Sequence, residues 1–72
     1  MKKKLITLAK EMDFNTESEY FDYLIECHIN GSFLQCKRLF AEMRKEDQKA
    51  LITYIDEYST EKAIRNFYFN LL

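Results

Sequence analysis

Two cysteines and the single histidine are the residues of this sequence best suited to chemistry, and they lie close together in the chain. Cys27, His28 and Cys36 are all of the types that bind zinc. A structural zinc site takes four ligands, usually in paired units such as C-x-x-C, and the sequence offers neither a fourth ligand nor such a pair. Adjacent ligands on a helix also point about 100° apart. We therefore predict no metal and no cofactor, with Cys36 as a small core residue and Cys27 beside an apolar stripe.

Catalysis by His28 would need partners that the sequence does not supply. Cys36 and His28 acting as nucleophile and base would require a pocket and a third orienting group. At the end of a helix a histidine is favourable beside the helix dipole and bonds a carbonyl of the last turn, which is the simpler interpretation. Four carboxylates precede it without a base among them, as is typical of a solvated helix face: Glu17, Glu19, Asp22 and Glu26. The single glycine excludes every glycine-rich phosphate loop, so we predict that the protein is not an enzyme and has no catalytic residue.

Short helices are the elements that must position these groups. Glycine occurs once and proline never, so the sequence has few points at which a helix would break. Apolar residues recur at the spacing of one helix face, which predicts helices over residues 3–13, 17–29, 33–44, 46–58 and 61–71. A chain of 72 residues forms one domain at most. We therefore predict an all-α fold over residues 1–72, a compact bundle of four to five short helices.

The large apolar residues of these stripes make up the predicted core. Its members are Leu5, Leu8, Tyr20, Phe21, Leu24, Ile25, Phe33, Cys36, Leu39, Phe40, Met43, Leu51, Tyr54, Ile55, Ile64, Phe67 and Tyr68. The stripe of the fourth helix also includes Ala50 and Tyr58, and that of the fifth includes Ala63 and Leu71. A pair between Glu61 and Arg65 supports the fifth helix.

Capping signals place the helix ends. Two segments fit the S/T-x-x-E/Q capping box, at 16–19 and at 32–35, and Ser59-Thr60 offers an N-cap for the last helix. Gly31 suits the left-handed residue after a helix, which predicts a tight αα-corner at Asn30-Gly31. No apolar residue lies between Met43 and Ala50, so we predict a break near 44–45, with one continuous helix over 33–58 as the alternative.

The C-terminal helix is the segment most typical of an interaction surface. Residues 67–72 are apolar around most of the helix, and one face is enough to meet the core. Either this helix is central and buried on both sides, or its remaining residues face a partner. A small chain buries only about 60% of the surface of its unfolded form, which favours oligomerisation. We predict a non-enzymatic protein-interaction module, a homodimer or a binder of another protein, with Phe67, Phe69 and Leu72 in the interface.

Nucleic-acid binding is the alternative function. Helices 17–29 and 33–44, joined at Gly31, are similar in outline to a helix-turn-helix. The candidate contacts are Gln35, Lys37, Arg38, Arg44 and Lys45. Against this, the turn is short, the preceding helix is acidic and the net charge of the chain is −1, whereas nucleic-acid domains are usually basic. Pairing of this basic edge with the acidic helix explains the same charges.

The sequence gives an expectation about the cellular setting. Residues 5–9 are apolar but end at Lys10-Glu11, which is too short for a secretory signal, and no segment approaches the length that crosses a bilayer. We therefore predict a cytoplasmic protein with free thiols and no membrane partner.

One stretch resembles a known group of proteins. It consists of residues 26–40 and 44–48, with the Ile29-Asn30-Gly31 turn, Gln35 four residues later, and a Lys/Arg-Glu-Asp start to the next helix. These pieces are similar to small uncharacterised helical proteins of gut Bacteroidetes-type bacteria and their phages or mobile elements. The resemblance implies a cytoplasmic bacterial setting and an accessory or regulatory role, and it assigns no functional residue.

Overall fold

The computed structural model describes residues 2–58 and 62–72, and five α-helices lie within these ranges. They are α1 (Leu5–Glu11), α2 (Glu17–Ile29), α3 (Phe33–Ala41), α4 (Lys45–Tyr58) and α5 (Lys62–Phe69). The predicted all-α fold is confirmed, and so is the break between the third and fourth helices. Several helices are shorter than predicted, because α1, α3 and α5 end in turns one or two residues before the last residue of their apolar stripes.

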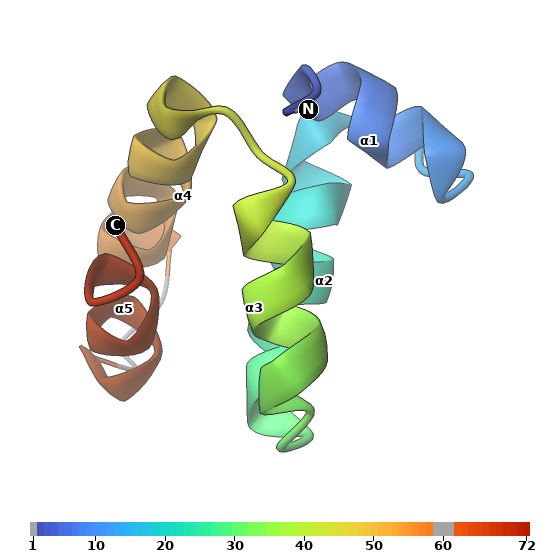
Figure 1. Ribbon diagram of the computed structural model, residues 1–72. Helices are drawn as coiled ribbons and strands as arrows, with labels where there is room; N and C mark the ends of the chain where they lie inside the picture. Colours follow the sequence, from blue (N-terminus) through green and yellow to red (C-terminus); the bar gives the residue numbers. More distant parts are fainter. Residues whose placement is uncertain (1, 59–61) are drawn as a thin grey trace.

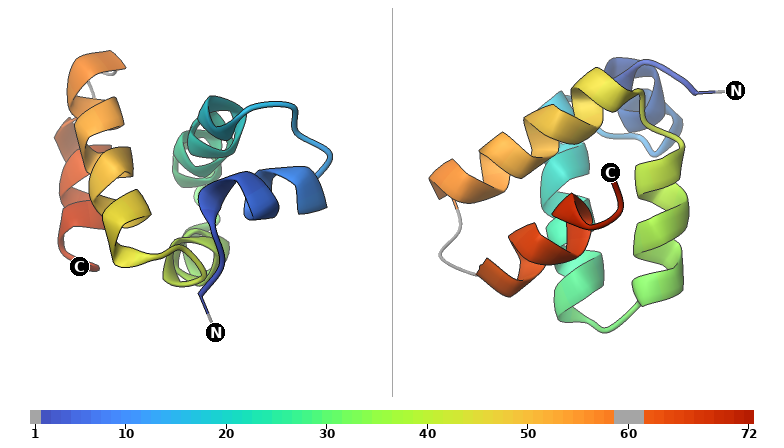
Figure 2. Two further views of the ribbon diagram at one scale, coloured as in Figure 1. Left: turned by 90° about the horizontal axis from the view of Figure 1, so that it is seen from above. Right: turned by 60° about the vertical axis from the view of Figure 1, so that its left-hand side comes forward.

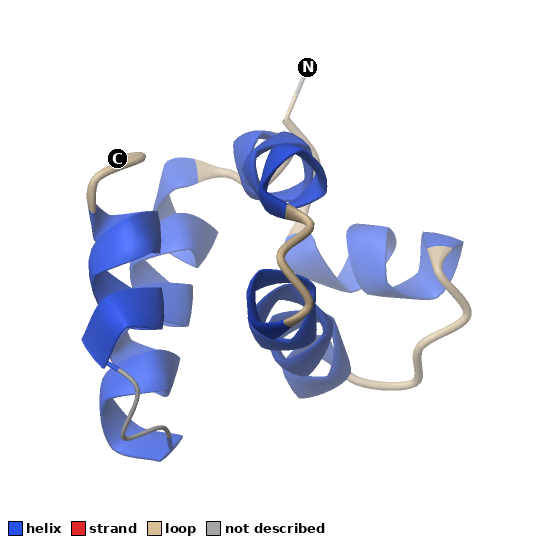
Figure 3. Cartoon of the chain, turned by 90° about the horizontal axis from the view of Figure 1, so that it is seen from below, coloured by secondary structure: helices blue, strands red, loops and turns tan. Residues whose placement is uncertain are grey.

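The helices form two antiparallel pairs and one crossing helix. α2 and α3 lie side by side, α4 and α5 form the second pair, and α1 lies across the end of the first pair that is remote from Gly31 (Figures 1 and 2). Short loops join consecutive helices within the described residues, as the view from the side of the Gly31 turn makes clear (Figure 3). One β-bridge, between Lys3 and Met43, is the only extended pairing in the described part of the chain.

The corner between α2 and α3 forms as predicted. Gly31 has φ +81°, and the N–H of Ser32 donates to the carbonyl of Cys27 at 2.9 Å, which closes a Schellman turn. α1 ends in the same way, with Asp13 at φ 62° and the Phe14 N–H bonded to the Ala9 carbonyl. Sequence inspection missed this second turn because a left-handed Asp is less common than a left-handed Gly.

The two predicted capping boxes have different outcomes. Thr16 caps α2, since its Oγ1 accepts from the N–H of Glu19 at 3.4 Å, while the Glu19 carboxylate accepts from the N–H of Asn15. The second box is wrong. Ser32 makes no side-chain cap bond, and Gln35 instead donates to the Tyr23 hydroxyl at 3.0 Å. The Ser59-Thr60 cap and the Glu61 partner of Arg65 lie outside the described residues.

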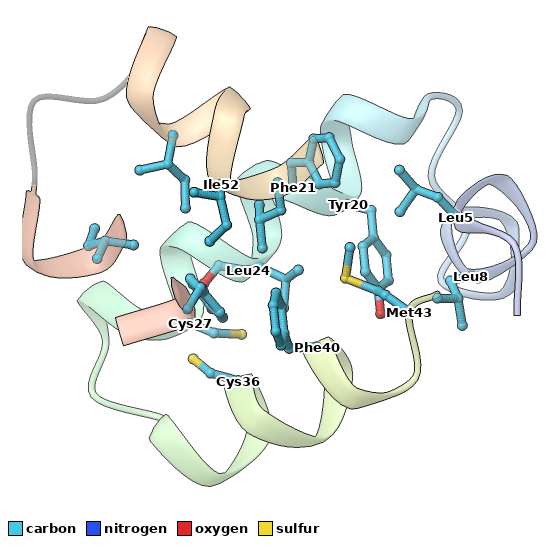
Figure 4. Close-up of a cluster of buried hydrophobic side chains, with 14 of the residues drawn as sticks. Leu5, Leu8, Tyr20, Phe21, Leu24, Cys27, Cys36, Phe40, Met43 and Ile52 are labelled. Carbon is cyan, nitrogen blue, oxygen red and sulfur yellow. The ribbon is translucent and has the colours of Figure 1, made fainter. Parts of the chain in front are cut away.

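One hydrophobic core lies between the two helix pairs and α1 (Figure 4). Most of the predicted core is buried or packed against it, and Cys27 belongs to it as well. Tyr20 and Tyr68 are fully buried, and each satisfies its hydroxyl on a backbone carbonyl, of Leu39 at 3.2 Å and of Leu24 at 2.7 Å. Phe33 is the exception among the predicted core residues, because it begins α3 at the corner and has packing on one side only.

The buried face of α4 differs from the prediction. Ala50 and Tyr58 are exposed, and Ala63 on α5 is exposed too. The face that meets the core is Gln48, Leu51, Ile52 and Ile55. These residues keep the i, i+3, i+4, i+7 spacing, but the stripe begins with a polar residue. The hydrophobic pattern therefore predicted Leu51 and Ile55 correctly, but it missed Gln48 and Ile52 on the buried face.

Gln48 is buried because its amide completes the end of another helix. Its Nε2 donates to the carbonyl of Phe40 at 2.8 Å, in the last turn of α3. The N–H of Met43 donates to the same carbonyl at 3.1 Å, so the amide is a second donor there. The neighbouring Asp47 accepts a hydrogen bond from a helix end instead of donating one. Its Oδ2 accepts from the N–H of Leu5 at 3.2 Å, at the start of α1. Arg44 approaches the same oxygen, with its Nε at 3.5 Å.

Replacement of Gln48 should measure the value of this bond. Gln48→Leu keeps the volume and removes one of the two donors to the Phe40 carbonyl, while the Met43 N–H remains, so we expect the free energy of unfolding to fall by about 0.5–1.5 kcal/mol. Urea unfolding followed by circular dichroism measures this change. Lys49→Leu, at an exposed neighbouring position, is the matched control and should change stability by about 0.5 kcal/mol or less. Equal stability of Gln48→Leu and the parent would contradict the structural role of this amide.

Candidate functional site

Three large apolar side chains are exposed together at the corner between α2 and α3. Ile29 ends α2 and is 62% exposed, while Phe33 and Leu34 begin α3 and are 47% and 82% exposed. We call these three residues the apolar corner. Its origin is local: the Schellman turn at Gly31 ends one helix and starts the next within three residues, so the end of α2 and the start of α3 lie at the same turn.

Aromatic packing supports the apolar corner from behind. The ring centroid of Phe33 lies 5.1 Å from that of His28 and 5.6 Å from that of Phe67 on α5. His28 and Phe67 are themselves in edge contact at 4.8 Å. Edge and tilted contacts at these separations are favourable for aromatic rings. Phe33 is therefore held in place on its inner side and presents its other side to solvent.

The edges of the apolar corner carry opposite charges. On α2, Glu26 is exposed one turn before Ile29. On α3, Arg38 is exposed one turn after Leu34. Leu34 and Arg38 line a shallow hollow of about 450 Å³ together with Phe33 and Gln35. The two charges come from neighbouring helices, because α2 and α3 lie side by side (Figure 1).

The three residues predicted for the interface lie in different places. Phe67 is partly buried and supports the apolar corner through Phe33. Phe69 is half-exposed on another side of α5, about 200° around the helix from Phe67, with the guanidinium carbon of Arg65 5.3 Å from its ring centroid. Leu72 lines a separate hollow next to α3 and α4. Of the three, only Phe67 reaches the apolar corner.

The five residues predicted to contact nucleic acid also lie in different places on the surface. Gln35 and Arg38 line the hollow at the apolar corner, whereas Lys37 and Lys45 line the one that includes Leu72. Arg44 is engaged by two carboxylates, at 3.1 Å from Glu46 and 3.5 Å from Asp47. The structure thus gives two small basic groups and no single basic surface made of the five residues.

The cysteines and the histidine of the sequence analysis are structural neighbours of the core. Cys27 and Cys36 are free and buried, and their thiols are turned towards each other between α2 and α3 (Figure 4). Burial raises the pKa of the Cys27 thiol, so the thiolate that would react or bind metal is disfavoured. Within residues 2–58 and 62–72 no group of three or more His, Cys, Asp or Glu side chains is placed to hold a metal ion.

Three tyrosines titrate above their ordinary range. Burial raises the pKa of Tyr20 and of Tyr68 well beyond the usual value for a phenol. At Tyr54 the main cause is a hydrogen bond, because its hydroxyl donates to Oδ1 of Asp22 at 2.7 Å. This bond, together with partial burial and the Asp22 charge, raises the pKa of Tyr54 to about 12. The bond joins α4 to α2 and fixes one helix pair against the other.

Comparison with known proteins gives no relative for this chain: no family model, no characterised protein and no solved structure matches it. The similarity of residues 26–40 and 44–48 to small bacterial and phage proteins therefore stays a prediction. None of the described helices is both long and apolar enough to cross a membrane.

Loss of stability at high pH should follow from the tyrosines. A folded-state pKa above the unfolded value of 10.0 means that the stabilisation is complete below pH 10 and is lost as the pH rises towards 12. We expect Asp22→Asn to move the Tyr54 transition back towards pH 10, because the asparagine carries no charge that opposes the phenolate. Ultraviolet titration of tyrosinate measures this. Glu17→Gln, an exposed change on the same helix, is the control, and superimposable curves for Asp22→Asn and the parent would contradict the assignment.

Proposed function

We propose that the protein is a non-enzymatic interaction module that pairs with a second copy of itself through the apolar corner. The single observation that carries the proposal is the joint exposure of Ile29, Phe33 and Leu34. Several large apolar side chains exposed within six residues of one turn favour an interaction surface, whereas single exposed apolar residues are ordinary. An accessory or regulatory role in a bacterial cell, as the sequence resemblance implies, would fit such a module.

The distribution of charge favours a second copy as the partner. A two-fold dimer brings the same patch of both chains together, so the patch must be complementary to itself. Glu26 is exposed on α2 and Arg38 on α3, so a two-fold axis at the apolar corner would set the acid of each copy against the base of its partner. Two symmetric ion pairs would then flank a shared apolar centre, which is the usual anatomy of an interface.

The support behind the corner also suits a binding surface. Phe33 is held by His28 and Phe67 before any partner arrives, so pairing orders few additional side chains. A surface that is already in place loses less conformational entropy on binding. The small size of the chain adds a second reason, since a dimer would bury apolar area that a 72-residue core leaves outside.

A charge at the centre of the apolar corner should separate the copies. We expect the parent to be a dimer and Leu34→Glu to raise its dissociation constant by about tenfold or more, because each dimer would lose two buried leucines. Leu34 makes its few contacts at an 82% exposed position, and an acid in the first turn of α3 is favourable with the helix dipole, so the fold should persist. Analytical ultracentrifugation gives the mass, and circular dichroism checks the fold.

Phe69→Glu is the matched control for this test. It places the same charge at a half-exposed apolar position on α5, away from the apolar corner. A monomeric Phe69→Glu with a dimeric Leu34→Glu would move the interface to α5, as the sequence alone suggested. A parent that sediments as a monomer at all accessible concentrations would refute self-association.

Charge reversal tests the two-fold arrangement itself. We expect Glu26→Arg and Arg38→Glu each to weaken the dimer by a few-fold, on the order of 0.2–1 kcal/mol for each exposed pair. The double variant restores both pairs with their signs exchanged, so it should regain most of the parent affinity. Additive weakening in the double variant would mean that these two residues do not face each other across the interface.

A further inference from the structure

A hollow on another face of the molecule has the character of an anion site. It has a volume of about 250 Å³ and is lined by Lys2, Lys37, Phe40, Ala41, Lys45, Gln48, Leu71 and Leu72. We infer that this lysine pocket binds a small phosphate-type anion, held by the three ammonium groups. The inference is independent of the apolar corner, which shares no residue with the pocket.

Four separate segments build the lysine pocket, and backbone contacts fix three of them. The N–H of Lys3 donates to the carbonyl of Glu42 at 3.1 Å, which holds the N-terminal segment and Lys2 beside the α3–α4 link. Lys37 comes from α3 and Lys45 from the first turn of α4. The C-terminal turn, which follows α5 and lies close to α3 and α4, closes the remaining side with Leu71 and Leu72 (Figure 2). Basic groups that are distant in sequence are thus brought to one place.

The charges of the lysine pocket are not neutralised by the described residues. None of the three ammonium groups has a carboxylate oxygen within 4 Å in residues 2–58 and 62–72. The acids nearest to Lys45 in sequence are engaged elsewhere, since Glu46 and Asp47 both pair with Arg44. By contrast, Lys3, which lies outside the pocket, is bonded to Glu11 at 2.8 Å. Three lysines that line one small hollow favour an anion there.

Gln48 adds a positioned donor at the lysine pocket. Its amide nitrogen has two N–H bonds, and one of them is directed to the Phe40 carbonyl. This bond fixes the orientation of the amide, because Gln48 is buried and cannot turn freely. Gln48 also lines the hollow, so we assign the second N–H of the same nitrogen as a donor to the bound anion. A neutral donor held by the core beside flexible lysines is a common way to orient a phosphate group.

Size and lining define the class of ligand. The volume is below the range of about 300–1,000 Å³ that is typical of pockets for drug-sized molecules, so the ligand is small. The apolar part of the lining consists of Phe40, Ala41, Leu71 and Leu72. Inorganic phosphate would use only the charged side, whereas a small organic phosphate monoester would also contact the apolar part. The two ligands share a phosphate group, and a comparison of their dissociation constants shows which of them the pocket prefers.

The test is a titration of the full chain followed by amide nuclear magnetic resonance. Inorganic phosphate and phenyl phosphate are added at constant ionic strength, with sodium chloride as the reference. We expect saturable shifts of the Gln48 side-chain amide and of Phe40 and Ala41, with phenyl phosphate binding more tightly if the ligand is an organic monoester. Lys37→Gln/Lys45→Gln should weaken binding by about fivefold or more, because two charge-assisted contacts are lost.

Lys10→Gln/Lys49→Gln is the matched control, since it removes the same net charge from two exposed lysines that do not line the pocket. It should leave binding within about twofold of the parent. Equal weakening in both double variants, or shifts no larger than those with chloride, would overturn the inference. Tight binding of duplex DNA that depends equally on all four lysines would also overturn it in favour of a diffuse nucleic-acid surface.

Discussion

The first turn of α4 completes the backbone hydrogen bonding of two other helices, and the arrangement of the chain depends on this junction. Asp47 accepts from the N–H of Leu5 at the start of α1, and Gln48 donates to the Phe40 carbonyl at the end of α3. Helix ends have orphan donors and acceptors that must be satisfied when buried. Asp47 satisfies the N–H of Leu5, and Gln48 adds a second donor to the Phe40 carbonyl beside the N–H of Met43, so both bonds tie the start of α4 to α1 and α3.

The candidate surfaces follow from this junction and from the Gly31 turn. With the start of α4 set against α3, the α4–α5 pair returns along the core and brings Phe67 behind Phe33. The same geometry places Lys45 near Lys37 and leaves the C-terminal turn beside them. The apolar corner is thus at the tip of one helix pair, while the lysine pocket is where the two pairs meet. The proposed partner and the proposed anion would occupy different parts of the molecule.

Local patterns predicted the helices, the Gly31 corner and most of the core, because each depends on residues close in sequence. They failed where a distant group decides the outcome. Gln48 is buried where its amide donates to the Phe40 carbonyl, eight residues earlier in the chain. The apolar pattern did not indicate it because its side chain is polar. The spacing of Phe33 predicts a core residue, yet the side chain is half-exposed because the turn beside it leaves one side without packing. The predicted basic residues were recognised individually, but their division between two hollows depends on packing that no local pattern records.

The cap that Asp47 provides for α1 also constrains the order of events during synthesis. The two residues are 42 positions apart, whereas the α2–α3 pair closes within a single short turn. As the chain leaves the ribosome, α1 emerges before α4 and lacks its acceptor until the start of α4 has followed it. Local contacts form before distant ones because short loops close at lower entropic cost. We therefore expect α1 to gain its full set of native bonds later than the α2–α3 pair does.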